Sequence, residues 1–210
     1  MKRLMSPHVA YIAIMLLLFA GPVRAENLLR NPSFEKQAPS GFNHASFWAM
    51  QQPTSRGDMY GSASREDWRS YDGLYIMTVR GQWADAGDYG GCWQEVEAES
   101  GTEYHASGWF WSDPEWEADI QEIKLEFWTS DYGRLLHREV VSLADVSPEW
   151  TRYDVLAMAP EGAAFVRLVV HAEGVGYYGA LQFDHMVLAK ADEYEDPVAI
   201  PVDLIIDILN

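Results

Sequence analysis

The stretch GGCWQEVEAESGTEYHASGWFWSD, residues 90–113, decides the fold. Side chains alternate over 92–96 and again over 104–111, and the Glu-Ser-Gly-Thr run at 99–102 predicts a short turn between two strands that form a hairpin. Period two places one set of small and aromatic side chains on a predicted core face: Tyr104, Ala106, Gly108 and Phe110. The opposite face, which is aromatic and polar, predicts a wet surface for a planar ligand: His105, Ser107, Trp109 and Trp111.

Similar strands recur along the rest of the chain, separated by turns rich in glycine, proline and aspartate. Strands are predicted over residues 73–81, 123–129, 135–143, 150–157, 165–172 and 181–189. In the second of these, Ile123, Leu125 and Phe127 alternate with Lys124, Glu126 and Trp128. No stretch has sustained helical periodicity. The chain is therefore predicted to be all-β, as a sandwich or a barrel.

Residues 1–25 are predicted to be a secretory signal peptide. Basic residues start the segment, an apolar run covers 9–20, and Val23-Arg24-Ala25 places small residues at the cleavage position. The alternative is a membrane anchor, but an apolar run of roughly a dozen residues is shorter than the ~20 that a span needs. We expect one domain over 26–189, and then a tail at 190–210, acidic at first and then apolar, which either docks on the domain or is a linker stub.

Charge and cysteine content narrow the classes of partner. The net charge is −17, and removal of residues 1–25, which hold three basic and no acidic residues, would make it −20. Such a chain repels phosphate backbones and anionic lipid, so nucleic acid is not expected as a partner. Membrane insertion is not expected once the signal peptide has been cleaved. Cys92 is the single cysteine, so no intrachain disulfide can form. We expect a monomer that is secreted, periplasmic or at the cell surface.

Five motifs in order resemble the cellulose- and xylan-binding carbohydrate-binding modules. They are NPSFE at 31–35, DGLYIMTVRG at 72–81, WQEVEAESGTEYHASGWFW at 93–111, Trp150 with Tyr153, and LQFDHMVL at 181–188. The resemblance covers residues 26–189. It implies a jelly-roll β-sandwich of two antiparallel sheets, of the galactose-binding-like group.

The resemblance also implies a structural calcium ion. Matching positions are Glu35 in the first motif and Asp184 in the last, with main-chain oxygens near Asp72 and Gly73 completing the shell. Calcium takes six to eight hard oxygen ligands, which such a set supplies. His185 stands where the family often has a second acid. The alternative is that Glu35 and Asp184 make ordinary strand-end hydrogen bonds.

The family's sugar site lies on a concave sheet with exposed aromatic rings and polar neighbours. Seven positions match: Trp109, Trp111, Trp128, Lys124, Glu126, Arg167 and His171. Indole rings stack on the flat C–H faces of pyranoses, and the flanking groups bind hydroxyls. For these tryptophans the alternative is packing beneath a loop, and we expect Trp93 and Trp150 inside the sandwich.

The chain is predicted to be non-catalytic. The acidic run at 113–119 is typical of a solvated loop, and the sequence has neither a G-x-S-x-G elbow nor H-E-x-x-H spacing. The leading hypothesis is a secreted module that binds a polysaccharide or oligosaccharide. The main alternative is a structural or adhesion domain of the cell envelope without an open cleft. A polysaccharide hydrolase or lyase is a third.

Overall fold

The computed structural model describes residues 26–39, 44–51, 63–80 and 88–194, and these form two antiparallel sheets. Residues Asn27–Asp192 make up the sandwich, to which the description below is confined. The predicted signal peptide and most of the predicted tail lie outside the described residues. No helix of the described part is long and apolar enough to span a membrane.

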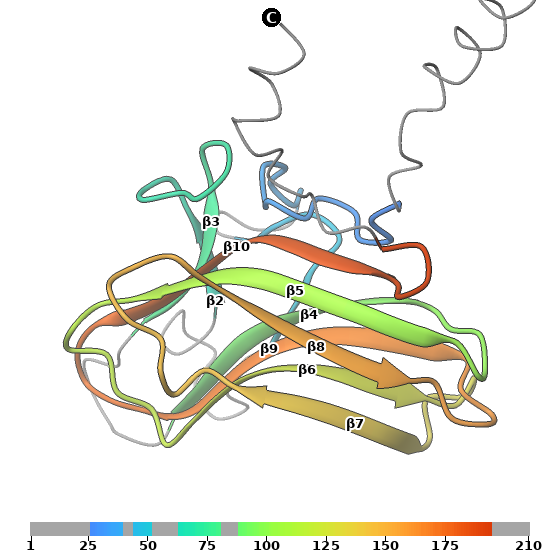
Figure 1. Ribbon diagram of the computed structural model, residues 1–210. Helices are drawn as coiled ribbons and strands as arrows, with labels where there is room; N and C mark the ends of the chain where they lie inside the picture. Colours follow the sequence, from blue (N-terminus) through green and yellow to red (C-terminus); the bar gives the residue numbers. More distant parts are fainter. Residues whose placement is uncertain (1–25, 40–43, 52–62, 81–87, 195–210) are drawn as a thin grey trace, which may run out of the picture. The chain divides into compact units, whose positions relative to one another are not determined.

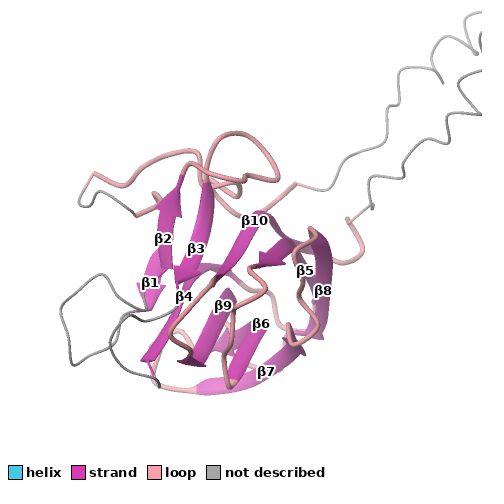
Figure 2. Ribbon diagram, turned by 90° about the vertical axis from the view of Figure 1, so that its left-hand side faces the viewer, coloured by secondary structure: helices cyan, strands magenta, loops and turns pink. Residues whose placement is uncertain are grey.

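Among the described residues, ten strands make up the two sheets. They are β1 (Ala49–Gln51), β2 (Ala63–Glu66), β3 (Ile76–Arg80), β4 (Asp88–Glu97), β5 (Glu103–Ser112), β6 (Ile120–Trp128), β7 (Leu135–Ser142), β8 (Thr151–Met158), β9 (Phe165–Val175) and β10 (Ala180–Lys190). Sheet 1 has the order β1-β4-β9-β6-β7 and sheet 2 the order β2-β3-β10-β5-β8. Figures 1 and 2 show the sheets as two stacked layers.

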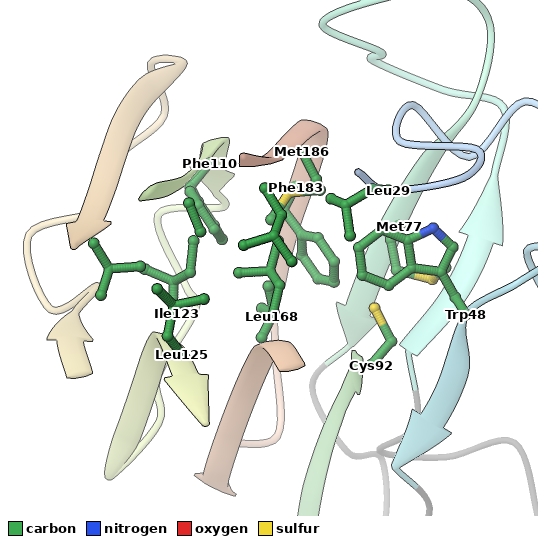
Figure 3. Close-up of a cluster of buried hydrophobic side chains, with 14 of the residues drawn as sticks. Leu29, Trp48, Met77, Cys92, Phe110, Ile123, Leu125, Leu168, Phe183 and Met186 are labelled. Carbon is green, nitrogen blue, oxygen red and sulfur yellow. The ribbon is translucent and has the colours of Figure 1, made fainter. Parts of the chain in front are cut away.

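Alternating side chains of both sheets meet between the layers. Sheet 1 contributes Cys92, Ile123, Leu125 and Leu168, and sheet 2 contributes Met77, Phe110, Phe183 and Met186, all fully buried (Figure 3). The predicted core face of residues 104–110 is confirmed, because Tyr104, Ala106 and Phe110 are at most 1% exposed. The all-β prediction and the two-sheet sandwich are also confirmed.

The prediction of a hairpin at residues 90–113 is wrong. β4 pairs with β1 and β9, whereas β5 pairs with β10 and β8, so the two strands lie in different sheets. The connecting residues cross one end of the sandwich and bond to other segments: Ala98 N–H donates to the Ala164 carbonyl, and Gly101 N–H to that of Ala159. Two alternating strands bury their apolar faces equally well when they face each other across a core.

Candidate glycan-binding face

The outward side of sheet 1 carries a cluster of aromatic and charged side chains from β4, β9, β6 and the β6–β7 turn. We call this cluster the Arg167 face, and its members are Trp93, Glu95, Glu122, Lys124, Glu126, Trp128, Tyr132, Arg167 and His171. Strand register gathers them, since Glu95 on β4, Arg167 on β9 and Glu126 on β6 lie side by side in one row. The strand residues beside these three in the sequence pack in or against the core, so period two sends the three side chains outward.

Arg167 lies at the centre of the face and is held from several sides. Its Nε donates to Glu95 Oε2 at 2.7 Å. The guanidinium carbon lies 4.2 Å from the Trp93 ring centroid and 4.7 Å from that of Trp128. Cation–π contacts of this kind fix an arginine in place while leaving N–H donors for a ligand. The Arg167 side chain keeps 17% exposure, so the group is ordered and still reachable.

Tyr132 adds an exposed ring at one side of the face. Its hydroxyl donates to Glu95 Oε1 at 3.0 Å, and one face of its ring stacks on Phe165, with centroids 4.7 Å apart. The residue is 48% exposed. The hydrogen bond to Glu95 is the main cause that raises the pKa of the Tyr132 phenol. Tyr132 therefore stays a neutral donor with an aromatic surface open to solvent.

Lys124 sits between two carboxylates on β6. Its ammonium lies 2.6 Å from Glu122 and 3.6 Å from Glu126, and its side chain is 8% exposed. Trp128 Nε1 donates to the other Glu126 oxygen at 3.2 Å. Buried charges of this kind need partners, and here the partners also hold the indole in place.

His171 completes the row beside Glu122. Its Nε2 lies 3.6 Å from a Glu173 oxygen, and its ring centroid is 6.3 Å from that of Tyr89. Burial is the main cause that lowers the pKa of His171, and the charge of Lys124 lowers it further. The imidazole is therefore neutral at pH 7 and offers a donor and an acceptor.

Trp109 and Trp111 do not belong to this face. Both are on β5 in sheet 2 and point out of the opposite side of the sandwich. Tyr71 stacks on Trp109, with centroids 4.2 Å apart and planes inclined by 15°, and the Arg69 guanidinium lies 3.8 Å from the Trp111 ring centroid. Trp111 is 3% exposed. The expectation of one face shared by all seven positions therefore fails for these two, since their strand is in the other sheet beneath the 67–75 loop.

Comparison with known proteins supports the architecture. No protein-family model matches the chain, and no curated protein matches it. Among solved structures, TmCBM61 in complex with β-1,4-galactotriose matches with a TM-score of 0.53 and 20% identity, over 79% of this chain and 99% of that one. The CBM22-1 xylan-binding domain from Paenibacillus barcinonensis Xyn10C matches with 0.51 and 14%, over 80% and 96%. The chain has the jelly-roll fold of carbohydrate-binding modules.

The same fold also occurs within larger proteins. The enzymatically active domain of tailspike protein 4 from bacteriophage CBA120 matches with a TM-score of 0.59 and 12% identity, over 78% of this chain and 21% of that one. Identities this low show the fold alone. A carbohydrate-binding-module fold by itself does not determine the ligand, which depends on the side chains that the site presents.

The residues predicted to hold calcium meet at the loop before β3: Asp72 belongs to this loop, and Glu35 and Asp184 bind its N–H groups. Asp184 is fully buried, and its carboxylate accepts the N–H groups of Tyr71 and Asp72 at 2.9 Å each and that of His185 at 2.7 Å. Glu35 Oε1 accepts the N–H groups of Leu74 and Tyr75, each at 2.9 Å. The first and the last sequence motifs, which contain Glu35 and Asp184, are thus both hydrogen-bonded to the loop before β3.

These carboxylates have the chemistry for a cation but do not form a complete side-chain cage. Within the described ranges, no group of three or more His, Cys, Asp or Glu side chains is arranged to hold a metal ion. Burial raises the pKa of Asp184 to about 7, so the three N–H groups that it accepts compensate its charged form only in part. A cation bound through one or two carboxylates and main-chain oxygens would supply that compensation. The residues therefore fit a calcium ion that is bound by these carboxylates together with main-chain oxygens.

Four members of the Arg167 face were missed from sequence. Trp93 was expected inside, yet it is partly exposed and points outward, because Cys92 and Gln94 on either side of it point inward. The same alternation would have placed Glu95 on the face, and the alternation of β6 would have added Glu122. Tyr132 belongs to a turn with a left-handed backbone (φ 56°), and no periodic pattern predicts where its ring lies. Trp150, also expected inside, lies partly exposed beside Tyr71.

Proposed function

We propose that this chain is a secreted, non-catalytic module that binds a polysaccharide or oligosaccharide across the Arg167 face. One observation carries the proposal: Arg167 is held between two indoles and Glu95, next to the exposed ring of Tyr132. Sugar sites combine rigid aromatic surface with paired donors and acceptors, and this face offers both. The shared fold with TmCBM61 and the CBM22-1 domain supports the proposal.

The chemistry sets a modest affinity. An aromatic ring half covered by a pyranose contributes on the order of 2–3 kcal/mol, at about 25 cal/mol/Å² of apolar surface. Hydroxyls would bind the carboxylates of Glu95 and Glu126 and the free N–H groups of Arg167. After the entropy cost of association, two or three such contacts give a Kd of roughly micromolar to millimolar.

Affinity electrophoresis on a glycan panel tests the proposal. We expect β-1,4-galactan, xylan or a β-glucan to retard the protein, and Tyr132→Ala to weaken retardation about tenfold or more, by loss of stacking. Tyr177→Ala is the matched control, because Tyr177 is also 48% exposed but lies in the β9–β10 loop. If no glycan retards the protein, or if both variants weaken binding equally, the assignment to the Arg167 face is wrong.

Export, assembly and lack of turnover are part of the same proposal. Mass spectrometry of the exported chain should find a new N-terminus at Glu26, and light scattering should find a monomer. Incubation with each retarding glycan should release no shorter products. Release of reducing ends or unsaturated ends would instead show a hydrolase or a lyase.

We also propose a structural calcium ion held by Glu35 and Asp184, with oxygen atoms of the Asp72–Gly73 segment. Its role would be to neutralise buried Asp184 and fix the loop that covers sheet 2. EDTA should lower the melting temperature, and calcium should restore it more than magnesium does, since the latter needs stricter geometry. An unchanged melting temperature in EDTA would refute this part and leave the glycan proposal standing.

A structural or adhesion domain remains the second candidate. The observation that favours it is that charges on the Arg167 face already pair with one another, as Lys124 does with Glu122 and Arg167 with Glu95. In that case the face needs no ligand, and the glycan panel would give no retardation.

A further inference from the structure

A hollow of about 450 Å³ continues the Arg167 face beyond β4, at the end of the short edge strand β1. Its walls include Arg30, His44 and Phe47 from the N-terminal segment, together with Trp93 and Glu95 of the Arg167 face. This volume lies in the range of small-ligand sites. We call it the Arg30 hollow. A ligand lying across Arg167 would reach it over Trp93.

The main chain of Arg30 is fixed by a two-way clamp. Arg30 N–H donates to Gln94 Oε1, and Gln94 Nε2 donates back to the Arg30 carbonyl, both at 2.8 Å. Gln94 is 4% exposed. The side chain of Arg30 itself is exposed, so a rigid main chain presents a reachable guanidinium.

Phe47 holds the guanidinium from one side. The Arg30 guanidinium carbon lies 4.1 Å from the Phe47 ring centroid. Phe47 is 47% exposed and has a left-handed backbone with φ 75°. An aromatic residue rarely adopts this conformation, and such strain is concentrated at binding sites. One wall of the Arg30 hollow thus combines the exposed ring and strained backbone of Phe47 with the positive charge of Arg30.

The charge balance of the hollow favours an anion. Both oxygens of Glu95 are engaged, one by Arg167 and one by the Tyr132 hydroxyl, so its charge is already compensated. Arg30 has no carboxylate within ion-pair distance among the residues that the structure describes. In a chain of net charge −17, this leaves a local positive charge on an exposed side chain.

We propose that the Arg30 hollow is a subsite for an acidic sugar unit, whose carboxylate is bound by the Arg30 guanidinium. The planar fork of arginine matches a carboxylate with two parallel hydrogen bonds. The pyranose ring would lie against Trp93, and the neighbouring units of the chain would cross the Arg167 face. This inference rests on the proposed function and gives it a ligand class, a glycan that carries uronic acid residues.

Calorimetry on matched ligands tests this inference. The probes are glucuronoxylan and polygalacturonate, each compared with its carboxyl-reduced form, in which the acid becomes a primary alcohol. We expect at least one acidic form to bind about tenfold or more tighter than its reduced form, as charge-assisted hydrogen bonds imply. Arg30→Gln should abolish that preference and leave the affinity for the reduced form unchanged. Lys36→Gln is the control, because it removes one nearby charge outside the hollow.

The outcomes separate the two proposals. Equal binding of acidic and reduced forms, or a preference that survives Arg30→Gln, overturns the acidic-sugar subsite while glycan binding stands. Equal loss of both forms in Arg30→Gln also overturns it, since the residue would then act on the face as a whole. Absence of binding to every glycan, neutral or acidic, removes both.

Discussion

Arg167 and Glu95 face each other across the β4–β9 pairing, 2.7 Å apart, with both side chains 17% exposed. The pair is mostly withdrawn from water and flanked by indole rings, so screening by solvent is reduced. Its two members come from strands far apart in sequence that only the sheet order brings together. The geometry of the Arg167 face therefore depends on this pair as well as on the aromatic rings.

A double-mutant cycle on Arg167→Gln and Glu95→Gln should show a coupling free energy of about 1 kcal/mol or more in urea unfolding. The reason is the low exposure of both partners. Lys190 and Glu99 are the control pair, since they lie 2.8 Å apart but Glu99 is 69% exposed. That cycle should give less than about 0.5 kcal/mol. Equal couplings would mean that the Arg167 face is solvated like an ordinary surface.

Arg167→Lys keeps the charge, yet it should weaken glycan binding about as much as Arg167→Gln does. Lysine lacks the planar fork and stacks poorly on the two indoles. Calorimetry with whichever glycan retards the wild-type protein measures this. Full retention of affinity in Arg167→Lys would show that charge alone matters at this position.

Tyr71→Ala distinguishes the two aromatic surfaces. Removing the ring that stacks on Trp109 should lower the unfolding free energy by about 1–2 kcal/mol, and should make tryptophan fluorescence easier to quench with acrylamide. Glycan affinity should not change, because Trp109 lies on sheet 2. Loss of glycan binding in this variant, with the fold intact, would place the ligand on sheet 2 instead.

Local alternation in the sequence predicted the strands and their inner faces well. Ile123, Leu125 and Phe127 point inward and Lys124, Glu126 and Trp128 outward, as period two requires. Local alternation does not, however, predict which strands belong to which sheet. β4 and β5 are consecutive, and their separation depends on pairing with β9 and β10, which are distant in sequence.

Loop placement escaped prediction for a related reason. Trp109 is covered because Tyr71 stacks on it, and the Tyr71 main chain is anchored by Asp184, which comes 113 residues later. An alternating pattern tells which way a side chain points from its sheet, but not which distant loop then covers it. The predicted positions on β6 and β9 therefore do lie together on one sheet, while those on β5 lie on the other.

The pKa of Asp184 predicts an unusual dependence of stability on pH. In EDTA, burial raises this pKa from the ordinary 3.8 to about 7, so between these values the folded chain binds a proton that the unfolded chain has lost. The contribution of protonated Asp184 to the free energy of unfolding is therefore fully present below pH 3.8 and is lost as the pH rises through 7. Wild type should thus gain stability relative to Asp184→Asn as the pH falls from 8 to 5.

Urea unfolding of both proteins at several pH values measures that difference. Excess calcium should reverse the pH dependence of the wild-type free energy of unfolding, because the ion binds the ionised carboxylate and competes with the proton. A difference between wild type and Asp184→Asn that stays constant with pH in EDTA would show that Asp184 is ionised throughout.

Gly73 is constrained both by its left-handed backbone and by its close approach to Glu35, and comparison with Gly101 separates the two effects. It has φ +69°, and a Cβ added there would lie 2.3 Å from Glu35 Oε1, the oxygen that accepts the N–H groups of Leu74 and Tyr75. Gly101 has a similar φ of +79° but nothing within 4 Å of an added Cβ. Gly101→Ala should therefore cost only the left-handed strain of about 1–2 kcal/mol.

Gly73→Ala should cost about 1–3 kcal/mol more than Gly101→Ala, because displacing Glu35 breaks its two hydrogen bonds to the loop, each worth about 0.5–1.5 kcal/mol. Thermal unfolding of both variants in EDTA gives the comparison free of any bound ion. In the presence of calcium the difference in stability between the two variants should become larger, since Glu35 is also a proposed ligand of the calcium ion. If the two variants lose the same stability in both conditions, the Glu35 carboxylate fixes neither the loop nor the ion.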